Sequence, residues 1–458
     1  MNGAKEYHER NAVQVDRISE LPDHIIHHIL SLLPTIEVVR MCLVSKHWKR
    51  LCYKVTALQF SEFSMGQNLT QRNFPTFLRF FNLLMTRDEE PLVSKLKLEL
   101  CSFTRRSISL RSWFNFVLTN RSDVLANLKE LDLCVETSDC VENHLLPETV
   151  FRLRSLTLLR LCGVMLKGSE FVNLPYLKSL SLENVQLDNQ VLHNLLTSCS
   201  SLENLLLKKI VDVWHLNVSS SSLTSLKIDT GGSFTSKVNV EAKNLQSFVF
   251  IGSFSYPSLK FLSPCETIRD LSLCRAYFRN DKGLQSLLLK LPFLESLALD
   301  KCFFPGVVTI CSPHLRHFAF RGEIISKGLE TTIDTPNLVS FSFEGYVEPK
   351  LSLIASNPLK ASIKLYRREF ECRDVYDTHW YSDLLNFLAN FDCFRNVNLQ
   401  VISEKALVFP SQCRRLSRPP LPTLKHLKVK VMSPLSKNHD LRDALFWASP
   451  SLETLLIE

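Results

Sequence analysis

Apolar residues recur along most of the chain in the order LxxLxL, with mainly polar residues at the x positions. Alternation of apolar and polar residues predicts a strand that buries one of its faces. The clearest copies begin at Leu177, Leu202, Leu223, Leu245, Ile268, Leu294, Leu315 and Leu338. Because these starts lie about 21 to 26 residues apart, the pattern predicts a series of short strands at a nearly constant interval.

Weaker copies extend the series in both directions and bring the expected number of strands to roughly sixteen. They begin at Val55, Val93, Leu128, Leu156, Ile363, Val397, Leu424 and Leu452. This period and this strand signature are typical of leucine-rich repeats. We therefore expect a curved solenoid in which parallel strands line the concave face.

Some intervals between the predicted strands hold apolar residues at helical spacing. These intervals are residues 112–118, 189–196, 282–289, 383–388 and 441–447. In a leucine-rich-repeat solenoid the helices lie on the convex side. The fold class expected from the repeats is therefore α/β.

The N-terminal region follows a helical spacing instead. Pro22 fits the first position of a helix, and Asp23 stands in its first turn, where a negative charge is favourable. Thr35 and Ser45 are predicted to cap a second and a third helix. Three such short, apolar helices are too small to bury all of their apolar surface, so a partner is expected to cover part of it.

Residues 21–51 resemble an F-box. The motifs that carry the resemblance are Leu21-Pro22, Ile29-Leu30, Leu33-Pro34, and Val44-Ser45-Lys46-x-Trp48 followed by Leu51. The resemblance implies that the helices dock on a Skp-type adaptor, which links to a cullin. It assigns to the adaptor-facing surface Leu21, Pro22, Ile25, Ile29, Leu30, Val44, Ser45 and Trp48.

Leu33, Leu43 and Leu51 are expected to hold the three helices together. An alternative role for the helices is to shield the first repeat of the solenoid. The two roles are compatible.

The irregular repeats behind the F-box resemble the large plant group of F-box proteins with leucine-rich repeats. We expect a tail that is disordered over residues 1–15, a three-helix F-box over residues 16–56 and a solenoid over residues 57–458. The consensus Leu and Phe residues are interpreted as core. A substrate must then contact the residues that alternate with them and face the concavity.

The alternation rule selects residues on several strands, with Glu344 among those at the strand ends. The predicted substrate-binding candidates are Leu206, Lys208, Lys227, Val249, Ile251, Asp300 and Arg321. An apolar patch with a charged rim suits recognition of a protein or a small ligand. The alternative is that the inner face is irregular and partly covered by loops of the chain itself.

Composition excludes several other classes. The formal net charge of +8 is spread thinly over 458 residues, so no nucleic-acid partner is expected. Residues 1–17 lack the apolar stretch of a secretory signal, and apolar runs are too short for a membrane helix. The 14 cysteines include no CxxC pair, so we expect reduced thiols, no metal and a location in the nucleus or cytoplasm.

Catalytic motifs and cofactor motifs are also missing from the sequence. It contains no phosphate-binding glycine loop, no GxSxG and no HExxH. We therefore expect a non-catalytic substrate receptor of an SCF-type (Skp–cullin–F-box) ubiquitin ligase. The alternatives are a sensor of a small molecule or hormone, and a scaffold that binds the adaptor without leading to degradation.

Overall fold

The computed structural model describes residues 20–61, 76–77, 79–83, 93–101, 125, 127–136, 145–167, 172–211, 213–231, 237–252, 258–261, 266–278, 282–304, 307–322, 330–347, 350–356, 358–366, 376–434 and 439–458. The expected tail and the helix expected at residues 112–118 lie outside these ranges. None of the helices within them is long and apolar enough to cross a membrane. The chain divides into two compact units, Met1–Cys162 and Gly163–Glu458.

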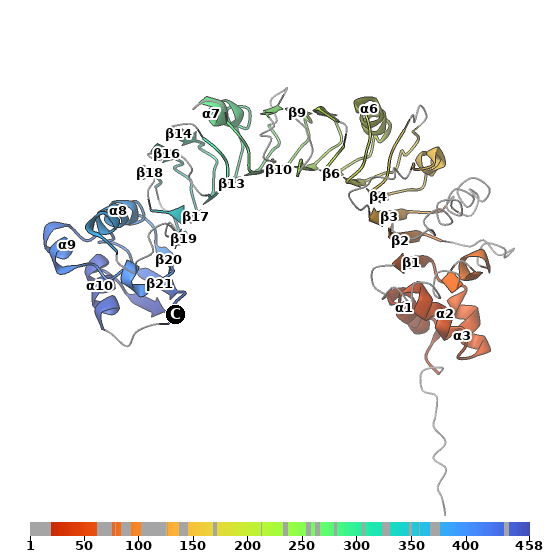
Figure 1. The fold of residues 1–458 in the computed structure, drawn as a ribbon, viewed down its shortest axis with the longest axis horizontal. Helices are drawn as coiled ribbons and strands as arrows, with labels where there is room; N and C mark the ends of the chain where they lie inside the picture. The colour runs from red at the N-terminus through yellow and green to blue at the C-terminus, as the bar shows by residue number, and fades with distance from the viewer. Residues whose placement is uncertain are drawn as a thin grey trace, which may run out of the picture. The chain divides into compact units, whose positions relative to one another are not determined.

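The first unit begins with three short helices, α1 (Asp23–Leu32), α2 (Thr35–Met41) and α3 (Lys46–Cys52) (Figure 1). Ser45 caps α3 as predicted, because its hydroxyl accepts a hydrogen bond from the backbone N–H of Trp48 at 3.1 Å. Pro22 stands at the cap of α1, one position earlier than predicted. The three helices lie where the apolar spacing places them.

Thr35 does not cap α2, and that prediction is wrong. The helix begins at Thr35 itself, and Pro34 occupies the cap position. The Thr35 hydroxyl instead accepts a hydrogen bond from the backbone N–H of Gln59 at 2.7 Å. Because Gln59 lies in strand β1 (Ala57–Ser61), this bond attaches the helices to the first strand.

The rest of the first unit holds a parallel sheet. Its strands are β1, β2 (Lys95–Cys101), β3 (Glu130–Glu136) and β4 (Leu158–Cys162), and each pairs with the next in chain order. A short 3-10 helix, η1 (Glu148–Arg152), precedes β4. The buried residues of these strands alternate with partly exposed ones, as expected for a sheet with one buried face.

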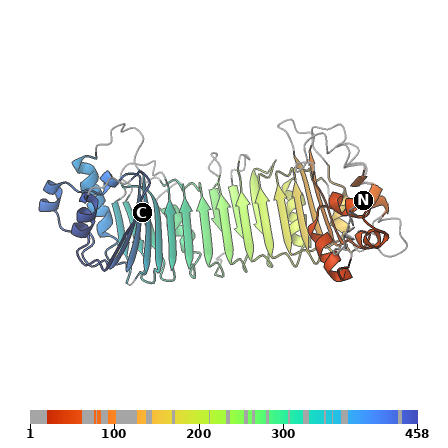
Figure 2. The same cartoon turned by 90° about the horizontal axis from the view of Figure 1, so that it is seen from below.

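The second unit contains a long parallel sheet, whose strands stand side by side (Figure 2). Its strands are β5 (Ser179–Glu183), β6 (Asn204–Lys208), β8 (Ser225–Asp229), β10 (Ser247–Ile251), β12 (Asp270–Cys274), β13 (Ser296–Asp300), β15 (His317–Arg321), β17 (Ser340–Tyr346), β19 (Lys360–Tyr366), β20 (Asn396–Val401), β21 (His426–Val431) and β22 (Thr454–Ile457). Each predicted copy of the repeat coincides with a strand in one of the two units.

Unit 2 curves into an arc, with strands such as β6, β10 and β13 on its inner side (Figure 1). Helices lie at the predicted intervals: α6 (Asn189–Ser198), α7 (Lys282–Leu288), α8 (Thr378–Ala389) and α10 (Asp440–Ala448). Two further short helices are η2 (Glu404–Ala406) and α9 (Ser411–Leu416). The solenoid with strands on the concave face is thus confirmed within this unit.

Some repeats carry strands rather than helices on the outer side, which the sequence did not predict. One small parallel sheet consists of β7 (His215–Ser219), β9 (Lys237–Glu241) and β11 (Ser258–Phe261). The other consists of β14 (Val308–Cys311), β16 (Glu330–Asp334) and β18 (Lys350–Ile354). These repeats are too short to accommodate a helix, so extended chain covers the core instead.

The core lies between the two sides of the arc, and the consensus Leu and Phe residues fill it as predicted. Aromatic rings gather beneath α8: the ring centroid of Phe341 lies 5.6 Å from that of Phe318 and 5.5 Å from that of Phe391. Burial of one Phe side chain contributes roughly 1.5–3 kcal/mol. This end of the solenoid therefore gains much of its stability from aromatic packing.

A left-handed residue follows several strands of the second unit. Asn184, Lys209, Arg275 and Lys301 have φ values of 51°, 51°, 51° and 49°. Their N–H groups donate to carbonyls at the end of the next strand, as from Lys209 to Asp229 at 2.7 Å. Left-handed backbone is costly for residues other than Gly, and the repeated hydrogen bond offsets that cost.

Candidate functional site

Four large apolar side chains of the N-terminal helical unit face solvent, two on α1 and two between α2 and α3. The exposed fractions are 38% for Ile25, 72% for Leu32, 88% for Leu43 and 53% for Val44. We call these four residues the N-terminal apolar patch. Single exposed apolar residues are common, but a group within one small helical unit marks a surface for interaction.

The predicted adaptor-facing residues divide into three groups by exposure. Pro22, Ile25 and Val44 are exposed; Leu21, Ile29 and Ser45 are partly buried; Leu30 and Trp48 are buried. The exposed fractions of Leu30 and Trp48 are only 0% and 2%. We therefore correct the assignment of these two residues, because their side chains pack in the core of the helical unit.

Leu43 requires the opposite correction, since it was expected to hold the helices together and is almost fully exposed. Leu51 is buried as expected, and Leu33 is partly buried. Leu32 belongs to the patch but was not predicted. The apolar stripe of α1 is so wide that spacing alone cannot separate its core edge from its outer edge.

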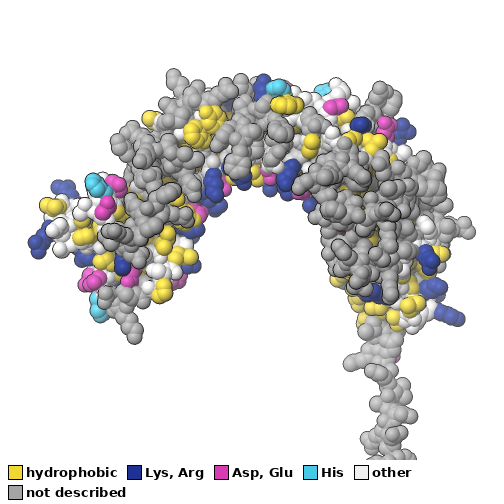
Figure 3. Space-filling model, viewed as in Figure 1, with side chains coloured by type: hydrophobic (Ala, Val, Ile, Leu, Met, Phe, Trp, Pro, Cys, Tyr) yellow, Lys and Arg dark blue, Asp and Glu magenta, His cyan; other side chains and the backbone are white. Residues whose placement is uncertain are grey.

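The inner face of unit 2 consists of the side chains that alternate with the buried residues. The register aligns these side chains from strand to strand. The end row comprises Glu183, Lys208, Asp229, Ile251, Cys274, Asp300, Arg321, Glu344, Lys364, Gln400 and Lys430. Charged side chains of both signs lie along the inner side of the arc (Figure 3).

Five of the seven predicted substrate-binding candidates lie together on β6, β8 and β10. Lys227 is exposed and stands between Leu206 and Val249 in the register, and both of these neighbours are partly exposed. Lys208 and Ile251 flank Asp229 in the end row. The Lys208 ammonium forms an ion pair with the Glu183 carboxylate. The sheet thus places apolar and charged candidates side by side.

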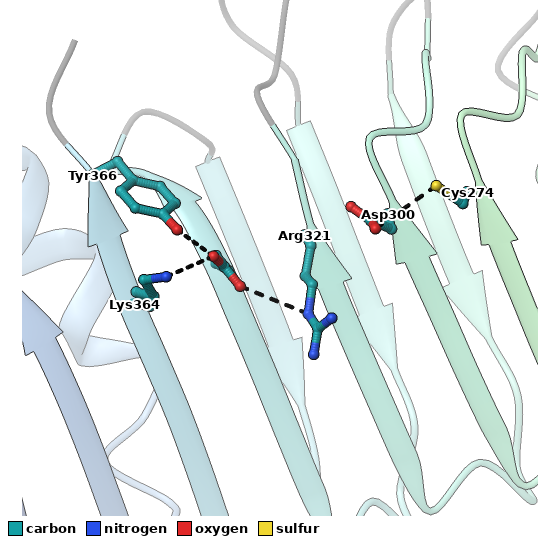
Figure 4. Close-up of polar contacts among 6 residues, drawn as sticks. Cys274, Asp300, Arg321, Lys364 and Tyr366 are labelled. Atoms are coloured by element: carbon teal, nitrogen blue, oxygen red, sulfur yellow. Dashed lines mark hydrogen bonds and ion pairs between the residues drawn. The ribbon is translucent and has the colours of Figure 1, made fainter. Parts of the chain in front are cut away.

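The other two candidates, Asp300 and Arg321, are opposite each other on β13 and β15 and are separated from the first five by β12. The Cys274 thiol donates to Oδ2 of Asp300 at 3.7 Å (Figure 4). Burial raises the pKa of that thiol, and the nearby carboxylate of Asp300 raises the pKa further. The seven candidates therefore form two groups on one face rather than a single site.

Glu344 is the centre of a polar cluster in the end row, and its partners Arg321, Lys364 and Tyr366 are labelled in Figure 4. Its Oε1 accepts hydrogen bonds from the Tyr366 hydroxyl and from Lys364 Nζ, the latter at 2.9 Å. Arg321 Nε lies 3.7 Å from its Oε2. These donors, the Tyr366 hydroxyl above all, hold the pKa of Glu344 below its ordinary value.

Two tyrosines stand beside this carboxylate. Lys364 Nζ lies 4.9 Å from the centroid of the Tyr366 ring, and the Tyr346 and Tyr366 centroids are 6.4 Å apart. The repeat pattern did not mark Lys364, Tyr346 and Tyr366 as candidates. The alternation around Ile363 and Leu365 would have marked Lys364, but the strand was known there only as a weak copy of the repeat.

The inner face of the first unit carries a separate group of polar side chains. Arg160 Nη1 lies 3.9 Å from Oδ2 of Asp132. Burial raises the pKa of Asp132, against the opposing effect of Arg160. Cys134 is opposite Cys162 in the register, and a hydrogen bond between the two thiols raises the pKa of Cys134.

The part of the chain that the structure describes offers no group of three or more His, Cys, Asp or Glu side chains able to hold a metal ion. The ten cysteines whose side chains are described, among them Cys42, Cys199 and Cys413, form no disulfide.

Two domain families match this chain. Residues 18–57 match the F-box domain, and residues 110–264 match the leucine-rich repeats of the family described as FBD-associated F-box protein At5g56370. The first match contains all three N-terminal helices and the N-terminal apolar patch. The second extends from the first unit through strand β11.

Several proteins of Arabidopsis thaliana are similar to this chain. The F-box/FBD/LRR-repeat protein At2g05300 is 31% identical over 291 residues, which are 60% of this chain and 61% of the relative. The F-box/FBD/LRR-repeat protein At5g22610 is 34% identical over 46% of this chain and 42% of its own length. For the F-box/LRR-repeat protein At2g42720 the identity is 33%, over 47% of this chain and 48% of the relative.

The matched region thus spans roughly two fifths to three fifths of the length of these relatives. The predicted resemblance to plant F-box proteins with leucine-rich repeats is confirmed. The chain has an F-box at its N-terminus, followed by leucine-rich repeats with parallel strands.

Proposed function

We propose that this chain is the substrate-recognition subunit of an SCF-type ubiquitin ligase. The F-box docks on a Skp-type adaptor, and the repeat array holds a protein substrate for ubiquitin transfer. The chain itself contributes no catalytic group, and it works in the nucleus or the cytoplasm.

The N-terminal apolar patch is the observation that supports this proposal most directly. Leu32, Leu43 and Val44 are each more than half exposed and lie within the segment that matches the F-box domain. Burial of apolar surface contributes about 25 cal/mol per Å², so an adaptor that covers the patch gains a substantial part of its binding free energy there. F-box domains generally bind adaptors of the Skp type, which gives the patch a natural partner.

The inner face of unit 2 supports the second half of the proposal. It offers partly exposed apolar residues such as Leu206 and Val249 together with the exposed cation of Lys227. A polar and apolar mixture of this kind suits a protein partner. The strands hold these side chains in a fixed register, so the surface is formed before the substrate arrives.

The adaptor half is tested by affinity capture of a Skp-type adaptor with the full chain. Leu43→Glu with Val44→Glu places two charges in the patch, and we expect adaptor capture to fall at least tenfold while the thermal unfolding curve is unchanged. Leu416→Glu is the matched control, because Leu416 is 89% exposed but lies in α9. A double variant that captures the adaptor as well as the unmodified chain would disprove this docking surface.

The substrate half is tested with proteins captured by the double variant and the unmodified chain, each with and without proteasome inhibition. Proteins that bind the repeat array are expected to persist in the double variant while adaptor and cullin disappear. Their levels should rise in cells when the adaptor cannot bind. Captured proteins whose half-life does not depend on adaptor binding would instead indicate a scaffold, and capture that requires an added small molecule would indicate a sensor.

A further inference from the structure

The inner face of unit 2 is divided by charge. On strands β5 to β13 the inward-facing side chains include Lys208, Lys227, Glu183, Asp229, Asp270 and Asp300, so acidic residues outnumber basic ones. On strands β15 to β21 they include Arg321, Lys360, Lys364, Lys428, Lys430 and Glu344. We call the inner face of β15, β17, β19, β20 and β21 the basic half. The inner face of β5, β6, β8, β10, β12 and β13 is the acidic half.

Glu344 is the single carboxylate on the strands of the basic half, all of which lie within the described residues. It is already engaged by Arg321, Lys364 and Tyr366. Lys428 pairs with Glu458 at 2.7 Å. The basic half therefore retains positive charge after its internal ion pairs are formed.

Three cations of the basic half remain available. Lys360 and Lys430 are exposed and have no ion pair among the described residues, and Arg321 contacts Glu344 through Nε, which lies 3.7 Å from Oε2. The terminal amino groups of Arg321 point away from Glu344 (Figure 4). A guanidinium with two such groups is suited to bind a carboxylate through two parallel hydrogen bonds.

The surroundings of these cations favour a peptide chain. Tyr346 and Tyr366 lie in the same half, and Tyr and Arg are the residues that dominate binding energy in protein interfaces. The row next to Arg321, Glu344 and Lys364 carries the small side chains of Ala319, Ser342 and Ser362. A main chain can approach the sheet closely there, between the longer side chains.

We propose that the basic half binds a short acidic segment of the protein substrate, in an extended conformation, through Asp or Glu carboxylates. This inference rests on the proposed function, whose substrate class it specifies. Strands lie about 4.8 Å apart, so five strands span about 19 Å, which an extended segment of about six residues covers at 3.3 Å per residue.

The acidic half favours a short protein segment over a nucleic acid as the ligand of the basic half. A nucleic acid extends a uniform negative charge, and Asp270 and Asp300 on the neighbouring strands would repel it. A protein segment can place its carboxylates only where the cations are and present neutral or basic residues to the acidic half.

The test uses the full chain and a fluorescein-labelled octapeptide with Glu at alternate positions and Ser or Phe between them. The matched probe has Gln in place of every Glu. We expect the Glu peptide to bind at least about tenfold more tightly than the Gln peptide, and its binding to weaken with added salt. Equal binding of the two peptides would overturn the proposal.

A triple variant locates the binding site. Arg321→Gln, Lys360→Gln and Lys430→Gln remove three exposed cations, and we expect the dissociation constant of the Glu peptide to rise about tenfold. The control variant Lys178→Gln, Lys243→Gln and Lys405→Gln removes three exposed cations outside the basic half and is expected to bind the peptide within about twofold of the unmodified chain. An equal loss of peptide affinity in both variants would show that the Glu peptide is attracted nonspecifically by positive charge and would overturn the proposal.

Two further measurements complete the test. One compares the Glu peptide with other polyanions, and the other tests the proposed function separately. Tighter binding of a single-stranded decanucleotide than of the Glu peptide would overturn the choice of a protein partner, and so would binding that requires phosphoserine in place of Glu. Adaptor capture is measured on the same preparations. Capture without peptide binding refutes only this inference, whereas peptide binding without capture refutes the ligase role and leaves the acidic-segment site intact.

Discussion

Gly252 lies so close to the carbonyl oxygen of Arg275 that a Cβ at this position would stand 2.2 Å from it. The two residues occupy neighbouring repeats of unit 2, and the Gly252 N–H donates to Cys274 at 2.7 Å. Because the obstacle is backbone, a side chain here would force adjacent repeats apart. Gly252 is therefore required by the close approach of the two turns.

Gly252→Ala is expected to destabilise unit 2 by about 1–3 kcal/mol, the usual cost of forcing an extra carbon into packed structure. Gly322 provides the control, since it occupies the corresponding turn between β15 and β17 and its Cβ would meet no atom closer than 3.8 Å. Gly322→Ala should leave the urea midpoint unchanged or slightly raised. Equal midpoints for the two variants would contradict the packing argument.

Phe341→Ala is expected to destabilise the C-terminal part of unit 2 by about 3–5 kcal/mol, because the buried ring contacts Phe318, Phe391 and Phe394. Hydrogen exchange followed by mass spectrometry should show lost protection in β17, β19 and α8 before β5 and β6, since repeats contact mainly their neighbours. The control Leu416→Ala should change protection nowhere in that region. Uniform loss of protection along unit 2 would show that it unfolds as a single cooperative block.

The repeats could be predicted from the sequence because every copy gives the same signal. Leu205, Leu226 and Phe248 occupy one register position in adjacent strands, and each is buried. A period confirmed many times outweighs the uncertainty of any single strand. The outer sheets could not be predicted in the same way, because strands such as β7 and β14 have no constant consensus residue.

The candidate surfaces were predicted less well, for two physical reasons. Spacing on a short helix does not say which edge of a wide apolar stripe is covered, so Leu30 and Leu43 were assigned to the wrong sides. Alternation on a strand does identify inward residues, but it does not show which of them interact. The contacts of Glu344 with Lys364 and Tyr366 depend on neighbouring strands about 20 residues apart in sequence, and only the register brings them together.

Glu344 should make the free energy of unfolding depend on pH. Its pKa is lowered in the folded chain by Tyr366, Lys364 and Arg321, so it stabilises the fold above its unfolded pKa of about 4.3. That contribution is lost as the pH falls through the lowered folded value. The urea midpoint of Glu344→Gln should thus lie below that of the unmodified chain at pH 7 and approach it at pH 3.

The control for this comparison is Glu266→Gln, whose carboxylate is exposed and has no ion pair among the described residues. Its midpoint should follow that of the unmodified chain at both pH values. If the urea midpoints of Glu344→Gln and the unmodified chain differ by the same amount at pH 7 and pH 3, the contacts of Glu344 stabilise the fold through packing rather than through its charge.

Cys199 and Cys311 should differ strongly in reactivity. Cys199 is fully buried, and burial raises the pKa of its thiol to about 12, whereas Cys311 is exposed. Since the thiolate is the reactive form, only about one Cys199 thiol in ten thousand is ionised at pH 8 even when reagent can reach it. Mass spectrometry after timed iodoacetamide treatment should find Cys311 modified first, and early labelling of Cys199 would indicate local opening around α6.

Leu30→Ala and Leu43→Ala should separate stability from adaptor binding within one F-box. Leu30 is completely buried, so its truncation should cost about 2–5 kcal/mol and lower the temperature at which the helices unfold. Leu43 is 88% exposed, so its truncation should leave unfolding within about 0.5 kcal/mol of the unmodified chain. At a temperature where both variants are folded, only Leu43→Ala should weaken capture of the adaptor. If Leu30→Ala instead weakens capture as much as Leu43→Ala while fully folded, the adaptor must reach the interior of α1, and the boundary drawn here between core and docking surface is wrong.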